Sequence, residues 1–424
     1  MELRPGYKQT EIGVIPEDWN CSALDDYISF ISYGFTNPMP TTSSGPLMVT
    51  AADIFDGKVA VETARRTSQE AYDRLLTAKS KPRRNDILLT KDGALGRIGL
   101  VGEETICINQ SVAILRANNR IQPQFLALLL QADLYQKRMI EDAGGSTIKH
   151  IYITIVNRMP IAVPESKIEQ RAIAAALSDV DAALEGLERL IAKKRDLKQA
   201  AMQQLLTGKI RLPGFSGEWE LKRLAEIGDI RSGGTPSTSQ AHLWDGEIPW
   251  CTPTDITALD GRKYLSETAR TISAAGLRSS SAETIPPQSL IMTSRATIGE
   301  CAINSVAITT NQGFKNIVPF DGYDVEFLYY LMTTKKDDLI ALCGGSTFLE
   351  IGKKQLTSFI LAVPKERDEQ SAVAAVLSDM DTELAAVRAQ RDKTRLLKQA
   401  MMQELLTGRI RLPIPEEIPE VKYG

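Results

Sequence analysis

Hydrophobic residues follow a spacing of three and four in two long stretches, which predicts two long helices. The seam of the first stretch consists of Leu177, Val180, Leu184, Leu187 and Ile191. The seam of the second stretch consists of Leu377, Met380, Leu384 and Val387, and it weakens at Arg391. A narrow apolar seam is typical of a coiled coil. Two seams in one chain most simply pack against each other, so we expect an antiparallel pair of helices between two globular domains.

The predicted ends of the helices come from proline, capping and glycine residues. Pro164 and Pro364 are expected to end the secondary-structure element that precedes each helical stretch. Ser166 and Glu169 have the spacing of a capping box at the start of the first helix. Gly208 and Gly408 stand where each helix is expected to end.

The two helical stretches are copies of each other at an offset of 200 residues. Residues 164–213 and 364–413 align without a gap, and 27 of the 50 positions are identical. The match is closest at 197–213, where 14 of 17 positions agree and polar residues such as Gln203 and Thr207 are repeated. The need of the two helices to pair could by itself keep their sequences similar. Packing along the apolar seam, however, does not require the repeated polar residues. We therefore interpret the chain as two copies of a half-molecule, with a pseudo-twofold internal repeat.

The sequences that precede the two helical stretches are less similar to each other, but several short segments match. "DILLT" at 86–90 parallels "SLIMT" at 289–293, and Trp19 parallels Trp219. Short β-like runs alternate with helical stretches at 123–140 and 324–343, which indicates an α+β fold for both regions. The predicted domains are variable domain 1 (1–163), helical spacer 1 (164–213), variable domain 2 (214–363), helical spacer 2 (364–413) and a tail (414–424).

Composition excludes several classes of protein. The net charge is −3, so a nucleic-acid-binding role would need local basic patches. No apolar run reaches the roughly 18 residues of a membrane span, and the first residues lack the apolar stretch of a secretory signal. The five cysteines are scattered, which argues against disulfides or zinc and fits the cytoplasm. With His150 and His242 as the only histidines, a histidine-based catalytic triad or metal cluster is not expected.

No motif in the chain indicates catalysis. There is no phosphate-binding loop of the G-x-x-x-x-G-K-[ST] type. "NPMP" at 37–40 resembles the N-P-P-aromatic motif of amino-methyltransferases, but it lacks the second proline and the aromatic residue. We interpret it as a proline-bounded loop and expect the chain to be non-catalytic.

Several segments have the composition of a nucleic-acid surface. Residues 79–98 are rich in lysine and arginine, and the loops at 32–36 and 232–239 are small enough for a close approach to phosphate. For Asn109-Gln110 and Asn311-Gln312, adenine readout and a structural role at a strand end both remain open, as do a fold role and a phosphate contact for the "GGST" loops at 144–147 and 344–347. The predicted DNA-binding residues are Tyr33, Thr36, Lys81, Arg83, Arg84, Lys91, Arg97, Ser146, Thr147, Lys149, Ser232, Thr235, Ser237, Arg262, Lys263, Arg295, Lys315, Ser346 and Thr347.

The chain resembles the specificity subunit of type I restriction–modification systems. The resemblance rests on two blocks of the form "EQxAxAAxLSDxD" leading to "LKQAxMQxLLTGxIRLP", together with "SGGTPSTSQAHLWDGEIPWCTPTDI" at 232–256. The first half departs from the family here, because "SYGFTNPMPTTSSGPLMVTAADI" lacks the tryptophans.

This resemblance implies that each variable domain reads one half of a bipartite DNA site. It also implies that the helices set the gap and dock two modification methyltransferase subunits, with restriction subunits joining in some systems. S-adenosylmethionine, ATP and Mg are then expected on the partner subunits and no cofactor on this chain. The expected docking residues are Lys198, Gln199, Met202, Gln203, Leu206, Lys398, Gln399, Met402, Gln403 and Leu406. A rival hypothesis, favoured by the acidic pI near 5.8, is a duplicated adaptor that binds two proteins and no DNA.

Overall fold

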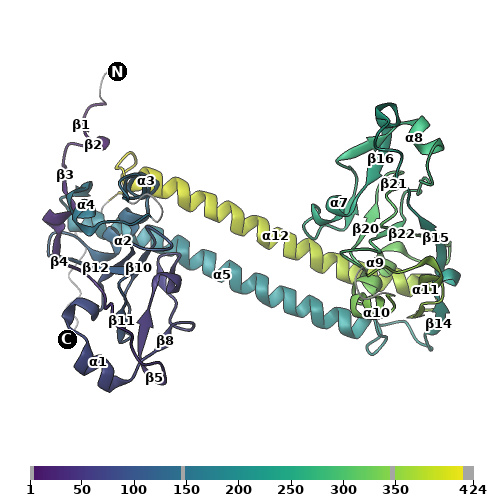
Figure 1. Ribbon diagram of the computed structural model, residues 1–424, viewed down its shortest axis with the longest axis horizontal. Helices are drawn as coiled ribbons and strands as arrows, with labels where there is room; N and C mark the ends of the chain where they lie inside the picture. The colour runs from purple at the N-terminus through teal and green to yellow at the C-terminus, as the bar shows by residue number, and fades with distance from the viewer. Residues whose placement is uncertain (1–3, 145–148, 344–348, 414–424) are drawn as a thin grey trace. The chain divides into compact units, whose positions relative to one another are not determined.

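The computed structural model describes residues 4–144, 149–343 and 349–413, and these form two compact units. Unit 1 comprises residues 1–188 and 390–424, and unit 2 comprises residues 189–389. Each unit therefore combines one variable region with the first part of one long helix and the last part of the other (Figure 1). This division differs from the linear one predicted from the sequence, because each long helix is shared between two units.

Unit 1 is built on a four-stranded sheet in the order β10-β9-β12-β4 and a three-stranded sheet in the order β11-β5-β8. Helices cover one face of the four-stranded sheet, and the smaller sheet covers the other (Figure 1). The strands and helices are β1 (Tyr7–Thr10), β2 (Gly13–Pro16), β3 (Trp19–Ala23), β4 (Ile28–Tyr33), β5 (Thr42–Val49), β6 (Ile54–Phe55), β7 (Lys58–Val59), β8 (Arg65–Arg66), α1 (Gln69–Leu75), β9 (Ile87–Thr90), β10 (Ile98–Leu100), β11 (Ile106–Ile108), β12 (Val112–Ala117), α2 (Pro123–Gln131), α3 (Asp133–Glu141), α4 (Ile153–Arg158), β13 (Pro160–Pro164) and α5 (Lys167–Leu205).

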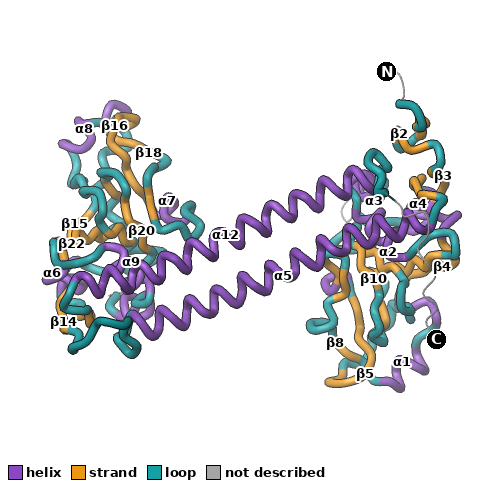
Figure 2. Tube along the Cα trace, turned by 180° about the vertical axis from the view of Figure 1, so that it is seen from behind, coloured by secondary structure: helices purple, strands orange, loops and turns teal. Residues whose placement is uncertain are grey.

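Unit 2 repeats this arrangement with a five-stranded sheet in the order β15-β22-β19-β20-β17 and a smaller sheet in the order β18-β16-β21. In Figure 2 the strands β16 and β18 stand together on one side of this unit, and β15 and β22 lie on the side of α6 and α9. The elements are β14 (Glu220–Arg223), α6 (Leu224–Ile227), β15 (Gly228–Ser232), β16 (Trp244–Cys251), α7 (Pro253–Thr257), β17 (Tyr264–Leu265), β18 (Arg270–Ile272), α8 (Ala274–Arg278), β19 (Leu290–Met292), β20 (Cys301–Asn304), β21 (Thr309–Thr310), β22 (Lys315–Pro319), α9 (Val325–Thr333), α10 (Lys336–Ala341), α11 (Lys353–Thr357), β23 (Ile360–Val363) and α12 (Arg367–Leu405).

Strand alternation explains how one sheet serves two cores. In unit 1, Leu89 and Leu115 belong to the core under α2 and α3, whereas Leu88 and Ile114 belong to the core shared with β5 and β11. Successive side chains of a strand point to opposite faces, so strands that are apolar throughout become buried on both sides. The predicted α+β fold in two repeated halves is confirmed.

The predicted helical stretch at 123–140 is divided. Helix α2 ends at Gln131, and Ala132 adopts an extended conformation (ψ 141°) before α3 begins. The side chain of Gln136 donates a 2.6 Å hydrogen bond to the carbonyl of Leu130, which satisfies part of the helix end. The stretch at 324–343 also divides, into α9 and α10, but Thr334 and Lys335 between them have ψ angles of −10° and 12° and are not extended.

Within each unit the two long-helix segments run antiparallel. In unit 1, Asp181 of α5 pairs with Lys398 of α12, and Glu188 further along α5 pairs with the earlier Arg395. Unit 2 carries the equivalent pair with the repeats exchanged, because Lys198 of α5 binds Asp381 of α12. The helices end at Leu205 and Leu405, and the following Gly208 and Gly408 have positive φ, as the sequence predicts.

Each unit is closed by an ion pair between the two repeats. In unit 1 the Arg411 guanidinium binds Glu169 at 2.8 and 2.6 Å, and Glu169 is 1% exposed. In unit 2, Arg211 binds the equally buried Glu369 in the same bidentate manner. We call these two contacts the closing ion pairs. The predicted capping box is therefore only half formed: the hydroxyl of Ser166 accepts from the Glu169 N–H at 3.4 Å, but the Glu169 carboxylate is taken by arginine.

The segment around each closing ion pair completes the core of its unit. Leu405 and Leu406 at the end of α12 pack with Ile173 and Leu177 of α5 in the core of unit 1. Leu205 and Leu206 do the same in unit 2 with Val373 and Leu377. In each unit, the repeated segment "LLTGxIRLP" of one repeat thus packs against the first turns of the long helix of the other repeat.

The closing ion pair of unit 1 yields a stability prediction. Arg411→Ala leaves the buried Glu169 carboxylate without its cation, and breaking a buried pair in this way costs about 3 kcal/mol, the low end of the usual range because Arg411 is partly exposed. The measurement is hydrogen exchange of unit 1 amides resolved by mass spectrometry. The matched control is Arg409→Ala, since Arg409 is exposed and lies 3.8 Å from Glu404. An equal effect of both variants on unit 1 protection would contradict the assignment.

Candidate nucleic-acid interface

One edge of the main sheet in each unit collects many of the predicted DNA-binding residues. In unit 1, β4 and β9 end at this edge and β12 begins there, as the pairs Tyr33–Ala113 and Thr90–Val112 show. In unit 2, Ser232 at the end of β15 pairs with Lys315 at the start of β22. We call this the strand-end edge.

A loop with the same backbone in both units forms the centre of the strand-end edge. The loop covers residues 91–96 in unit 1 and 294–299 in unit 2, and we call it the edge loop. The hydroxyl of the buried Thr90 donates to the carbonyl of Ala94 and accepts from the Arg97 N–H at 2.8 Å. In unit 2 the hydroxyl of Thr293 donates to the carbonyl of Thr297 and accepts from the Glu300 N–H at 3.1 Å. One buried threonine therefore holds the same turn twice.

Positive backbone angles occur at matching places of the two edge loops. Gly93 has φ +78° and Ala296 has φ +57°, and Gly96 and Gly299 follow with φ +79° and +81°. A positive φ is uncommon for alanine, so the fold holds Ala296 in this conformation. The residues before it, Lys91-Asp92 in one unit and Ser294-Arg295 in the other, occupy equivalent positions.

A second segment, the one that precedes α4 or α11, contacts each edge loop. The Ile151 N–H donates to the Lys91 carbonyl at 3.0 Å, and the Ile351 N–H donates to the Ser294 carbonyl at 3.1 Å. Next to these bonds, His150 contacts Asp92, and Arg295 forms an ion pair with Glu350 at 2.9 Å. Lys149 is exposed beside His150. The predicted site residues Ser146, Thr147, Ser346 and Thr347 lie outside the described residues.

Charged and aromatic side chains face each other at the edge in unit 1. The Lys91 ammonium lies 5.6 Å from the centre of the exposed Tyr33 ring and 2.7 Å from the Asp92 carboxylate. Burial acts to raise the pKa of Asp92, but hydrogen bonds from His150 and Lys91 outweigh it and lower the pKa below its ordinary value. Arg97 at the other end of the edge loop is exposed, and so is Thr36 beyond β4.

The equivalent cation in unit 2 comes from a neighbouring strand. Lys315 begins β22, is 6% exposed, and has a pKa lowered by burial. Arg295, Glu350 and Lys353 lie close enough to act on its charge. The hydroxyl of Thr235 contacts the Gln312 side chain at the same edge, while Ser237 bonds to Ser239 further along its loop.

The asparagines at the edge have local partners, as the structural interpretation predicts. The Asn109 side chain accepts from the Ser111 N–H at 3.2 Å, and Asn311 accepts from the Gly313 N–H at 2.8 Å. Gln110 and Gln312 are exposed. These side-chain bonds fix the turn into β12 and β22, so the shared pair serves the common fold.

The glycines of the two small-residue loops pack closely against neighbouring backbone. A Cβ added at Gly34 would lie 1.8 Å from the Ile108 carbonyl oxygen, and one added at Gly233 would lie 1.9 Å from the Asn311 carbonyl oxygen. These glycines are therefore required by close packing of backbone on backbone, and the expected close approach of the loops to phosphate stays a prediction.

The basic run 79–98 is divided by the sheet. Lys91 and Arg97 lie at the strand-end edge, whereas Arg83 and Arg84 precede β9 at the opposite end, where Arg84 pairs with Glu103 at 2.6 Å. Lys81 lies 4.5 Å from the Tyr72 ring centre. The basic run therefore does not form one continuous patch, and DNA contact by the residues at either end of β9 stays a prediction.

In unit 2, Lys263 lies away from the strand-end edge. Its ammonium binds Glu326 of α9 and the Ser378 hydroxyl of α12, the latter at 2.7 Å. The neighbouring Arg262 is exposed and bonds to the carbonyl of Leu259. Lys263 therefore joins the variable region of unit 2 to its helix and is not free for phosphate.

The expected docking residues separate into two groups. Six have partners within their own unit: Lys198 and Lys398 are in ion pairs with Asp381 and Asp181, and Met202, Leu206, Met402 and Leu406 pack on the cores. Gln199, Gln203, Gln399 and Gln403 are exposed. Two repeated apolar positions that the prediction missed are also exposed, Leu197 and Leu397 at 52% and 53%.

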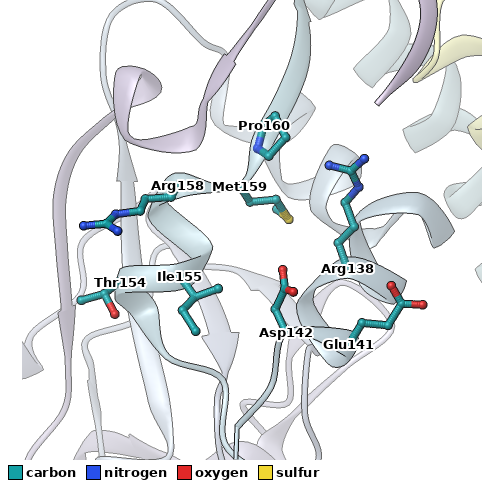
Figure 3. A pocket seen from close by; sticks show the side chains of 8 residues that line it. All are labelled: Arg138, Glu141, Asp142, Thr154, Ile155, Arg158, Met159 and Pro160. Atoms are coloured by element: carbon teal, nitrogen blue, oxygen red, sulfur yellow. The ribbon is translucent and has the colours of Figure 1, made fainter. Parts of the chain in front are cut away.

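The part of the chain that the structure describes also holds a pocket away from the strand-end edge. A pocket of 590 Å³ in unit 1 lies between α3 and α4, with Arg138, Glu141 and Asp142 on one side and Thr154, Ile155 and Arg158 on the other (Figure 3). Its lining mixes both signs of charge. Within residues 4–144, 149–343 and 349–413, no group of three or more His, Cys, Asp or Glu side chains is placed to hold a metal ion. In the same residues no helix is long and apolar enough to cross a membrane.

Sequence reasoning missed Asp92, His150 and Glu350 at the edge. The available signal was the correspondence of "DILLT" with "SLIMT", since continuing that alignment places Asp92 opposite Arg295. The contact with residues 150 and 350 is made across about 60 residues of chain, from 92 to 150 and from 295 to 350, and no local pattern reports it.

Known proteins match both halves of the chain. The family model described as "Type I restriction modification DNA specificity domain" matches residues 39–193 and 216–393. The specificity subunit of the type I restriction enzyme MjaIX of Methanocaldococcus jannaschii is 39% identical over 166 residues, which cover 39% of this chain and 38% of the relative. The putative specificity subunit of the MjaX enzyme from the same organism is 24% identical, over 96% of this chain and 97% of the relative.

Solved structures share the fold. The S subunit of a type I restriction–modification system from M. genitalium gives a TM-score of 0.58 at 17% identity and covers 96% of this chain and 98% of its own. A chain from a structural study of complex assembly and conformational transition in the type I system gives 0.62 at 20% identity, with 93% and 99% coverage.

The position of Lys263 yields a pH prediction. Burial acts to raise the pKa of Glu326, but hydrogen bonds from Lys263 and Ser378 outweigh it and lower the pKa below its ordinary 4.5. This stabilisation is present above pH 4.5 and is lost as the pH falls through the lower folded-state pKa. Glu326→Gln should therefore cost about 1 to 2 kcal/mol at pH 7, and the difference from the unaltered chain should shrink below pH 4.5.

The measurement is the thermal unfolding temperature of unit 2 against pH, with the exposed Glu283→Gln as the control. A difference that stays constant down to pH 3 would show that the Glu326 charge does not stabilise the fold.

Proposed function

The chain belongs to the type I restriction modification DNA specificity family, and from this premise we propose that each of its two units reads one half of a bipartite DNA sequence. The observation that carries the proposal is the strand-end edge, which has the same backbone in both units and different side chains. Equal backbones give equal docking on DNA, and unlike side chains give unlike base contacts.

The local charge of the edge supports nucleic acid as the ligand. Unit 1 places Lys91, Arg97 and Lys149 there, and unit 2 places Arg295, Lys315 and Lys353. The exposed cations among them, Arg97, Lys149, Arg295 and Lys353, can contact phosphates although the chain as a whole has a net charge of −3. The aromatic Tyr33 and the exposed glutamines add groups that contact sugar and base edges.

We further propose that the repeated helix ends dock two copies of one modification subunit, which supplies the methyl-transfer chemistry with S-adenosylmethionine. The proposed docking residues are the exposed Leu197, Gln199 and Gln203 in one unit and Leu397, Gln399 and Gln403 in the other, with the leucine on a different side of its helix from the two glutamines. The second copy borders a groove of 820 Å³ lined also by Val14, Lys137 and Leu396. Ile210 and Ile410 extend the repeat, and each is 54% exposed.

A domain exchange tests the recognition role. Residues 24–159 are replaced by the matching segment of another family member, which leaves β3, β13 and the closing ion pair of unit 1 intact. The modification complex is then assembled on the full chain in cells, and its methylated sites are read by modification-detecting sequencing. One half-site should change and the other should stay. A change in both half-sites, or in neither, would show that the units do not read DNA separately.

Charge substitutions test the docking role. Leu397→Glu should place a carboxylate among the proposed docking residues and remove one bound modification subunit. The double variant Leu197→Glu/Leu397→Glu should remove both subunits. Native mass spectrometry counts the subunits. Leu75→Glu, at a 64% exposed leucine in α1, is the matched control. Full occupancy by two subunits in the double variant would place the partner elsewhere.

A further inference from the structure

The two units carry opposite charges at matching positions of the strand-end edge. Position 92 of the first edge loop holds an aspartate, and position 295 of the second holds an arginine. Their partners are reversed as well, since Asp92 contacts His150 and Arg295 contacts Glu350. We call these the crossed pairs.

The backbone around the crossed pairs shows that the positions are equivalent. Residue 150 precedes the isoleucine whose N–H binds the Lys91 carbonyl, and residue 350 precedes the isoleucine whose N–H binds the Ser294 carbonyl. Thr90 and Thr293 hold the two edge loops through the same set of bonds. The crossed pairs therefore differ in chemistry and agree in placement.

Stability does not account for the crossed pairs. The Arg295 and Glu350 side chains are 46% and 37% exposed, and those of Asp92 and His150 are 23% and 42% exposed. A pair as exposed as Arg295–Glu350 adds little to the free energy of folding. The less exposed Asp92 gains some stability from its partners, which lower its pKa, but the equivalent position of unit 2 folds without a carboxylate. The same backbone accepts either charge pattern, so the fold does not prescribe one of them.

The exposed groups are suited to reading bases. The Glu350 contact is made through Nη2 of Arg295, so the guanidinium retains further donors in a planar fork. Arginine pairs with the O6 and N7 acceptors of guanine, and aspartate accepts from the N4 amino group of cytosine. Lys315 and Lys353 lie close to the Arg295 pair, whereas Lys91 and His150 both contact Asp92.

We propose that the crossed pairs are specificity-determining elements of the two recognition units. Arg295 donates to a guanine in the half-site of unit 2, with Glu350 setting the direction of its fork. Asp92 accepts from a cytosine amino group in the half-site of unit 1, with His150 as its support. This inference rests on the proposed function, because it assumes that each unit reads one half-site.

The test exchanges the two residues of one pair within the full chain assembled with its modification subunits. Arg295→Glu combined with Glu350→Arg keeps an ion pair at the same place and reverses its polarity. Discrimination at one base pair of the unit 2 half-site should fall by about 10- to 100-fold, and the unit 1 half-site should not change. The readouts are the methylated sites in cells and competition binding with DNA duplexes changed one base pair at a time.

A matched control uses another exposed pair of unit 2. Lys336→Glu with Glu300→Lys reverses an ion pair whose side chains are 49% and 47% exposed, and it should leave both half-sites unaltered. Two single variants extend the test if the exchanged pair does not fold. Arg295→Gln should relax the same base pair of one half-site, and Asp92→Asn should relax one base pair of the other.

The outcomes separate the two levels of the argument. A split methylated site from the unaltered chain, with unchanged discrimination in every folded crossed-pair variant, would overturn this inference and leave the proposed function standing. Absence of a split site from the unaltered complex would contradict the proposed function itself. Loss of discrimination in the Lys336–Glu300 control would also overturn the inference, since any charge change near the loop would then suffice.

Discussion

The buried carboxylates of Glu169 and Glu369 impose the constraint on which the two units depend. A carboxylate that is 1% or 3% exposed is costly unless it is paired, and its arginine comes from the other repeat. Arg411 and Arg211 bring the segment "LLTGxIRLP" with them, so Leu405 and Leu205 enter cores formed by distant parts of the chain. Much of the repeated sequence is thus explained by the closing ion pairs and by the leucines that complete each core. Only the exposed residues of the repeat are available to a partner.

Gln170 and Gln370 reinforce the same junction from within each unit. The Gln170 side chain accepts from the Gln122 N–H at 2.8 Å and donates to the Pro164 carbonyl at 2.8 Å, which ties the start of α5 to the start of α2. Gln370 makes the equivalent bonds to Asp324 and Pro364. The Glu-Gln pair at the start of each helix therefore has a structural role. The glutamate binds an arginine of the other repeat, and the glutamine binds backbone of the recognition region in the same unit.

The sequence predicted what depends on local pattern. The long helices, their glycine ends, the α+β regions and strands such as β9 and β12 follow from spacing and side-chain type. The ion pair of Arg411 with Glu169 was not predicted from the sequence. The two residues are 242 positions apart, and the local pattern around either residue gives no indication of the other. The basic run 79–98 misled for a related reason, since charge composition does not say which end of a strand a residue occupies. Asp92 and Glu350 were missed because acids were not sought on a surface expected to be basic.

Repetition of the scaffold also explains how one chain can carry two specificities. The edge loops are held by Thr90 and Thr293 from inside, so the side chains at their tips change without disturbing the sheet. Gly34 and Gly233 hold the neighbouring loops tightly against the backbone for the same reason. Rigid support with variable tips is the arrangement that separates the stability of a recognition domain from its choice of bases.

The central structural claim is that each recognition region is completed by the helix end of the other repeat. It is tested most directly by adding a peptide of residues 390–413 to a fragment of residues 1–188 and following hydrogen exchange in β9 and β12. The account predicts that the peptide binds and slows exchange in these strands, and that a peptide with Arg411→Ala binds about 10-fold or more weakly. Equal binding of the two peptides, or exchange that the peptide leaves unaltered, would contradict it.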